Sequence, residues 1–136
     1  MSHRGHSLVD GVGRGPVLFL SEPISFWGGV DPASGVIIDS RHPEVGSKVS
    51  ATVTVVSHGR GSSSSSSVVA EMIRLGTAPA AMIVGEPDMM IVVGSLVAAE
   101  LYGKVMPVAR VSAGVMADLA TASVAAVSPG GYLEID

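Results

Sequence analysis

The sequence predicts a single α/β domain in which a mixed sheet forms a sandwich or a barrel. Apolar segments of strand length come first along the chain and then alternate with helical patterns, which is typical of this class. Hydrophobic residues make up 47% of the 136 residues and charged residues only 15%, so we expect buried sheet faces and a surface hidden against a partner. Residues 1–136 are interpreted as one domain, with residues 1–10 as a flexible N-terminus.

Three strands are expected in the first half of the chain. Residues 16–20 are apolar after a leading proline, which a strand tolerates at its first position. Residues 36–39 are a short apolar segment that follows a turn-like Asp-Pro-Ala-Ser-Gly sequence. Residues 48–57 are the clearest strand, because apolar and hydroxyl-bearing residues alternate along most of the segment.

The second half is expected to alternate strands with helices. A helix is predicted over residues 68–75, because apolar residues recur there with helical spacing and Gly76 follows as a typical C-terminal residue. The same patterns predict a strand at 79–84, a helix at 95–102, a strand at 107–111, a helix at 113–121, and a hairpin of strands at 124–127 and 132–135.

Composition argues against several classes of protein. The net charge of −4 and the lack of a basic cluster argue against binding to nucleic acid. No apolar run approaches the roughly 20 residues of a membrane span, and the N-terminal residues lack the apolar stretch of a signal peptide, so we expect a cytoplasmic protein that does not contact membranes. The chain has no cysteine and no His, Asp or Glu group with metal-ligand spacing, so no metal site is expected on it.

The run Gly-Arg-Gly followed by six serines, residues 59–67, is the most informative feature of the sequence. Serine-rich segments are often solvated linkers, but this run lies directly between a predicted strand and a predicted helix. A helix that begins there presents free N–H groups to an anion, and Ser62 or Ser63 suits its N-cap. The run is neither a nucleotide P-loop nor a hydrolase nucleophile elbow. A catalytic triad with one of the four histidines is not diagnosed by any spacing.

Other candidate residues each have a structural and a functional interpretation. Phe26 and Trp27 precede two glycines and either close against a partner or substrate, or fill one end of the core. Arg60 either binds a carboxylate through two hydrogen bonds or is a solvated loop arginine. His42 is interpreted as an exposed loop histidine before a proline.

Several motifs resemble those of the aconitase X small-subunit family and occur in the family's order. They are Ile-Ser-Phe-Trp-Gly-Gly-Val-Asp at 24–31, Gly-Val-Ile-Ile-Asp at 35–39, His-Pro at 42–43, Gly46, Gly-Arg-Gly-Ser-Ser at 59–63 and Ala-Pro-Ala at 78–80. The Phe-Trp-Gly-Gly and Gly-Arg-Gly-Ser motifs are specific evidence for this family when they occur together, whereas either motif alone is weak evidence. The resemblance implies a swivelling β/β/α domain, similar to that of aconitase, which closes over a separate cluster-bearing body.

The resemblance also implies a function. The chain would be the small subunit of a hydro-lyase, inactive alone, that dehydrates a small hydroxy acid in a site shared with a large subunit. The first choice of reaction is cis-3-hydroxy-L-proline to pyrroline-2-carboxylate. The alternatives are a phosphomevalonate dehydratase small subunit and a non-catalytic swivel or binding module. An iron or iron–sulfur cluster is expected on the large subunit, which would form a heterodimer with this chain.

In that superfamily the serine after the glycine-rich turn is the catalytic base, which assigns Ser62, although the long run leaves Ser63 to Ser67 as alternatives. A helix N-terminus contributes only about 0.3–1 kcal/mol when exposed, so N–H donors, cations and a closed site must supply the remaining stabilisation of an alkoxide. The expected substrate-binding residues are Ser63, Arg60, Gly61, Phe26, Trp27 and Gly28.

Overall fold

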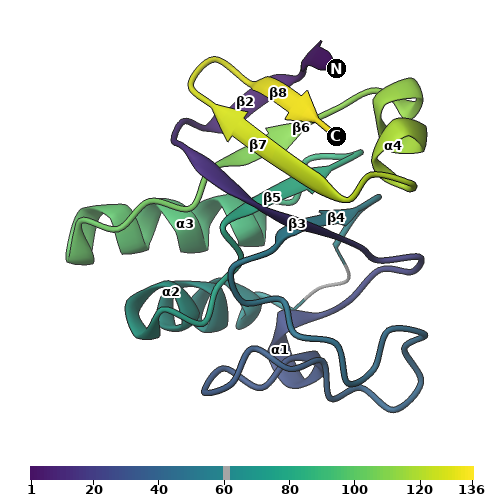
Figure 1. Ribbon diagram of the computed structural model, residues 1–136. Coiled ribbons are helices and arrows are strands. Elements are labelled where there is room, and N and C mark those ends of the chain that lie inside the picture. The colour runs from purple at the N-terminus through teal and green to yellow at the C-terminus, as the bar shows by residue number, and fades with distance from the viewer. Residues whose placement is uncertain (60–61) are drawn as a thin grey trace.

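The computed structural model describes residues 1–59 and 62–136, and within them eight strands form one mixed sheet that nearly closes into a barrel (Figure 1). The order of the strands is β1-β8-β7-β3-β4-β5-β6-β2. Their bounds are β1 (Ser2–Arg4), β2 (His6–Val9), β3 (Gly13–Phe19), β4 (Val53–Val56), β5 (Ala81–Val84), β6 (Val108–Arg110), β7 (Val124–Ser128) and β8 (Tyr132–Ile135). The predicted α/β class with a mixed sheet is confirmed, and the sheet is barrel-like.

Strand direction divides the sheet into two parts. Strands β3, β4, β5 and β6 run parallel to one another, whereas all other pairings are antiparallel. A parallel set has all of its carboxyl ends at one edge, which is where open α/β sheets bind ligands. The loops after β4, β5 and β6 meet at this edge.

The N-terminal residues close the sheet instead of forming a flexible arm. Strand β1 pairs with β8 and strand β2 pairs with β6, so the two strands lie at opposite ends of the strand order although only Gly5 separates them. The Gly5 N–H donates to the Gly131 carbonyl oxygen at 2.7 Å. The expectation for residues 1–10 was wrong because backbone pairing, and not an apolar pattern, orders most of this segment.

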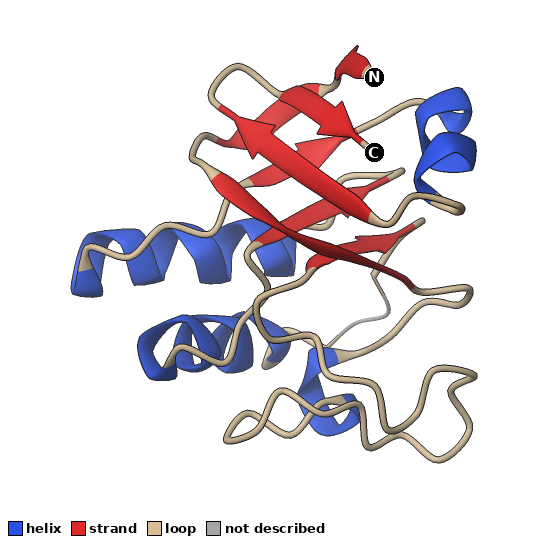
Figure 2. Ribbon diagram, in the orientation of Figure 1, coloured by secondary structure: helices blue, strands red, loops and turns tan. Residues whose placement is uncertain are grey.

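Helices cover the outside of the sheet (Figure 2). They are α1 (Phe26–Gly29), α2 (Ser65–Leu75), α3 (Met89–Tyr102) and α4 (Ala113–Leu119). Helices α2 and α3 lie side by side and pack closely where Gly94 of α3 meets Ser66 and Val69 of α2. No helix in the described ranges is long and apolar enough to span a bilayer.

The hydrophobic core has two parts, one on each side of the parallel strands. Strand β4 is buried along its whole length: Val53 and Val55 point into the barrel, whereas Val56 packs toward α2 and α3. This two-sided burial accounts for part of the apolar composition. Helix α3 accounts for a further part of the apolar composition. Several of its apolar side chains are exposed: Met89, Val93, Leu96, Val97, Leu101 and Tyr102.

One predicted strand is shorter than expected, and another is not a strand. Only Val53–Val56 of the 48–57 segment is a strand, because Ala51 adopts a φ of 60° and the Thr52 N–H donates to the Val49 carbonyl at 3.1 Å, which forms a turn. The 36–39 segment forms only isolated bridges to Val30 and Lys48.

The second-half elements follow the prediction more closely. Helix α2 ends at Gly76, which has a φ of 81° and forms the expected left-handed C-cap. Helix α3 begins six residues earlier than expected, because the Asp88 carboxylate accepts hydrogen bonds from Met90 N–H at 2.9 Å and Ile91 N–H at 3.4 Å. The β7–β8 hairpin is confirmed.

Candidate active site

The serine run lies at the carboxyl edge of the parallel strands. Strand β4 ends at Val56, and the chain then leads through Ser57, His58 and Gly59 to the serines that open α2. The expected substrate-binding residues Arg60 and Gly61 lie outside the described residues. In Figure 1, the start of α2 lies near α1, so two segments far apart in the sequence meet here.

The first serines form a turn that precedes the helix. The half-buried Ser62 accepts a hydrogen bond on Oγ from the Ser64 N–H at 3.2 Å, and its carbonyl accepts one from the Ser65 N–H at 2.9 Å. The N-cap is Ser64, so the prediction of Ser62 or Ser63 at that position was wrong. Ser63 is exposed. An N–H donor on Ser62 Oγ stabilises negative charge on that oxygen.

Ser65 connects the serine turn to the aromatic loop. Its side chain is only 4% exposed, and its Oγ accepts a hydrogen bond from the Trp27 N–H at 3.4 Å. The Ser25 Oγ lies 3.5 Å from the same oxygen. Ser25 was not a candidate from the sequence, and Ser65 was one only as a member of the serine run. Ser65 has the same helical phase as the buried Val69 and Met72, which indicates an inward-facing side chain.

The aromatic pair has two separate roles. Phe26 is buried and belongs to the core between the sheet and α2, whereas Trp27 is 60% exposed beside the serine turn. Gly28 has a φ of 81° and is exposed. Trp27 and Gly28 line an apolar cavity of about 370 Å³ with Ile38 and Val68. Phe26 therefore fills the core, whereas Trp27 and Gly28 lie on the surface.

Asp88, in the segment between β5 and α3, lies against the loop that precedes the serines. One carboxylate oxygen caps α3, and the other lies 1.4 Å from the position that a Cβ atom on Gly59 would occupy. The Ser57 carbonyl also accepts hydrogen bonds from Gly85 N–H at 3.0 Å and Glu86 N–H at 2.8 Å. The loops after β4 and β5 are thus held together, and a side chain at position 59 would require the Asp88 carboxylate to move.

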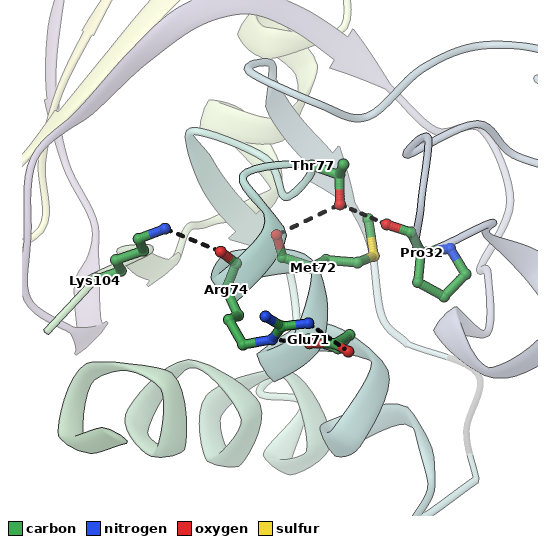
Figure 3. Close-up of polar contacts among 6 residues, drawn as sticks. All are labelled: Pro32, Glu71, Met72, Arg74, Thr77 and Lys104. Carbon is green, nitrogen blue, oxygen red and sulfur yellow. Dashed lines mark hydrogen bonds and ion pairs between the residues drawn. The ribbon is translucent and has the colours of Figure 1, made fainter. Parts of the chain in front are cut away.

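The far end of α2 is anchored as well (Figure 3). Thr77 Oγ1 donates to the Pro32 carbonyl at 2.6 Å, and Lys104 Nζ donates to the Arg74 carbonyl at 2.9 Å. Arg74 also pairs with Glu71, and its guanidinium lowers the pKa of that carboxyl. These contacts tie the C-terminal end of α2 to the loop at Pro32 and to the segment after α3.

His42 has a structural role, but it is not the exposed loop residue that we expected. It is 5% exposed, Nδ1 accepts from the Glu44 N–H at 3.1 Å, and Nε2 donates to the Glu22 carbonyl at 2.9 Å. These two contacts require the neutral Nε2–H tautomer. Across the described ranges, no group of three or more His, Asp or Glu residues could hold a metal ion.

Comparison with known proteins identifies the family. The family model described as "Aconitase X swivel domain" matches residues 2–135. The cis-3-hydroxy-L-proline dehydratase of Pseudomonas aeruginosa is 43% identical over 103 residues, which are 76% of this chain and 18% of that protein. The phosphomevalonate dehydratase small subunit of Methanopyrus kandleri is 37% identical over 119 residues, which are 88% of this chain and 84% of that subunit.

This chain spans about a fifth of the length of the hydroxyproline dehydratases of Pseudomonas aeruginosa and Hypocrea jecorina. A solved structure, the holo-form of Thermococcus kodakaraensis aconitase X, superimposes with a TM-score of 0.84 at 26% identity and covers 100% of this chain and 98% of that one. The resemblance inferred from the sequence motifs is confirmed: this chain belongs to the aconitase X swivel domain family.

Proposed function

We propose that this chain is the swivel-domain subunit of a hydro-lyase and supplies a serine base to an active site shared with a large subunit. The observation that carries the proposal is the position of Ser62, half-buried at the carboxyl edge of the sheet with the Ser64 N–H on its Oγ. Relatives named as dehydratases or as dehydratase small subunits support the reaction class.

The proposed reaction removes water from two neighbouring carbon atoms. Ser62, as an alkoxide, takes a proton from one carbon, the electrons of that C–H bond form the double bond, and the hydroxyl group leaves the adjacent carbon. Trp27 and Gly28 flank the serine turn and exclude water when the partner closes over them. Any iron or iron–sulfur centre belongs to the large subunit, because this chain has no cysteine.

We propose cis-3-hydroxy-L-proline as the first substrate and mevalonate 5-phosphate as the second. The hydroxyproline dehydratase of Pseudomonas aeruginosa supports the first choice. The phosphomevalonate dehydratase small subunit of Methanothermobacter thermautotrophicus, 43% identical over 88 residues that are 65% of this chain and 67% of that subunit, supports the second.

The test is reconstitution of the full chain with its large subunit, followed by assays with both substrates. We expect dehydration of one substrate by the complex and none by this chain alone. A Ser62→Ala complex should assemble normally and lose about 10²- to 10⁴-fold in kcat, the usual contribution of a general base. Full activity of Ser62→Ala would instead support a non-catalytic swivel module, and ester hydrolysis by this chain alone would indicate an autonomous hydrolase.

A further inference from the structure

A second cavity lies at the same edge of the sheet, where β5 and β6 end. It has a volume of about 540 Å³ and is lined by Arg4, Gly5, His6, Gly85, Arg110, Val111, Ser112 and Ala113. Two of these residues are arginines and none is acidic, although the chain as a whole has a net charge of −4. The cavity therefore concentrates positive charge within an acidic protein.

Strand pairing directs these basic side chains to one side of the sheet. His6 of β2 lies directly opposite Arg110 of β6, and residues opposite each other on antiparallel strands project from the same face with Cβ atoms about 4.5–5.5 Å apart. Arg4 precedes His6 by two residues, and alternate residues of extended chain point to the same side. Gly5 between them permits close approach, because a Cβ atom there would lie 2.6 Å from the Arg110 carbonyl oxygen.

The guanidinium groups in this cavity are available to a ligand. Within residues 1–59 and 62–136, neither Arg4 nor Arg110 forms an ion pair, and the only close partner of Arg4 is the ring of Tyr132, whose centroid lies 4.9 Å from Cζ. Stacking on the ring restrains that guanidinium and leaves its N–H groups free. Ser112 Oγ accepts the Val115 N–H at 3.3 Å, so its own hydroxyl proton can point into the cavity.

We propose that Arg4, His6 and Arg110 form a binding site for the phosphate group of a small molecule. Two planar guanidinium groups offer several N–H donors to the oxygens of one phosphate, a geometry that suits this anion. The volume exceeds that of a phosphate ion, so the site accommodates a phosphate ester. The cavity shares Gly85, Val111 and Ala113 with a neighbouring cavity that His58 also lines, so it opens toward the loop that leads to the serines.

The site is independent of the proposed base, and so is its test. Inorganic phosphate and glycerol 1-phosphate are titrated into the ¹⁵N-labelled full chain, and amide shifts are followed by NMR. We expect saturable shifts at Gly5, His6, Arg110 and Val111 and none in the serine turn, with the ester binding at least as tightly as the free ion. Absence of saturable shifts with both ligands, or shifts centred on residues 62–66, would overturn the proposal.

Matched variants separate this site from general attraction to positive charge. Arg110→Gln should weaken phosphate binding about tenfold or more, whereas Arg14→Gln removes the same charge from an exposed position that lines none of these cavities and should leave binding unchanged. Equal binding by wild type and Arg110→Gln, or equal losses in the two variants, would contradict the assignment. The wild-type shift map decides the question even if Arg110→Gln folds poorly.

Discussion

The packing of α3 against α2 makes Gly94→Ala a sharp test of the fold near the serine turn. A Cβ atom on Gly94 would lie 2.7 Å from the Ser66 carbonyl oxygen and 2.8 Å from Val69 Cβ. Both atoms belong to α2, and one is backbone, so a methyl group there must push the helices apart. Overpacking of this kind costs about 1–3 kcal/mol.

Gly114→Ala is the matched control, because a Cβ atom there would meet only Ser112 Oγ, at 3.9 Å. Both substitutions replace glycine by alanine within a helix and gain up to about 1 kcal/mol of helix propensity. The difference between the variants therefore isolates the cost of overpacking at Gly94.

The difference is measured by thermal unfolding of the full chain, followed by circular dichroism. An unfolding entropy of about 2.1 cal/mol/K per residue converts 1 kcal/mol to about 3.5 °C in a chain of 136 residues. Gly94→Ala should thus melt about 3.5–10 °C below Gly114→Ala. A Gly94→Ala protein that melts at or above the Gly114→Ala protein would refute the close packing of α2 on α3.

Two further predictions concern stability. Met72→Ala should lower the free energy of unfolding by about 2–5 kcal/mol, because Met72 is 0% exposed. Met89 is 60% exposed, so Met89→Ala should lower the free energy of unfolding by well under about 1 kcal/mol. Equal urea midpoints for the two variants would contradict this prediction. Hydrogen bonds from Ser7 Oγ and the Gly130 N–H lower the pKa of Asp10, so the stability that they supply is present above the ordinary carboxyl pKa and is lost as the pH falls through the lowered value. Asp10→Asn should therefore be less stable than wild type at neutral pH and approach it in acid, as pH-dependent unfolding will show.

Local signals in the sequence predicted the elements whose contacts are local. The Pro-Gly-Gly sequence predicted the β7–β8 hairpin, and Gly76 predicted the end of α2, because turn and cap conformations depend on a few adjacent residues. The closure of the sheet by residues 1–10 depends on pairing with strands about 100 or more residues away, and no local pattern reports such pairing.

In the candidate site, too, local features could be predicted from the sequence and long-range contacts could not. The glycine-rich turn between a predicted strand and a predicted helix indicated Ser62 as a candidate, and the helical phase of Ser65 could have shown that Ser65 faces inward. The hydrogen bond from the Trp27 N–H to Ser65 Oγ joins segments 38 residues apart and could not be predicted from either segment. The position of His6 opposite Arg110 likewise depends on the register of β2 on β6.

The most direct test of the proposed base is proton exchange at the substrate carbon. The reconstituted complex is incubated with substrate in D₂O, and deuterium incorporation and product formation are measured for wild type, Ser62→Ala and Ser63→Ala. Both reactions should fall by at least about 10²-fold in Ser62→Ala and by less than about tenfold in the exposed neighbour Ser63→Ala, with assembly intact in each. If Ser62→Ala still exchanges the proton at the wild-type rate, Ser62 is not the base.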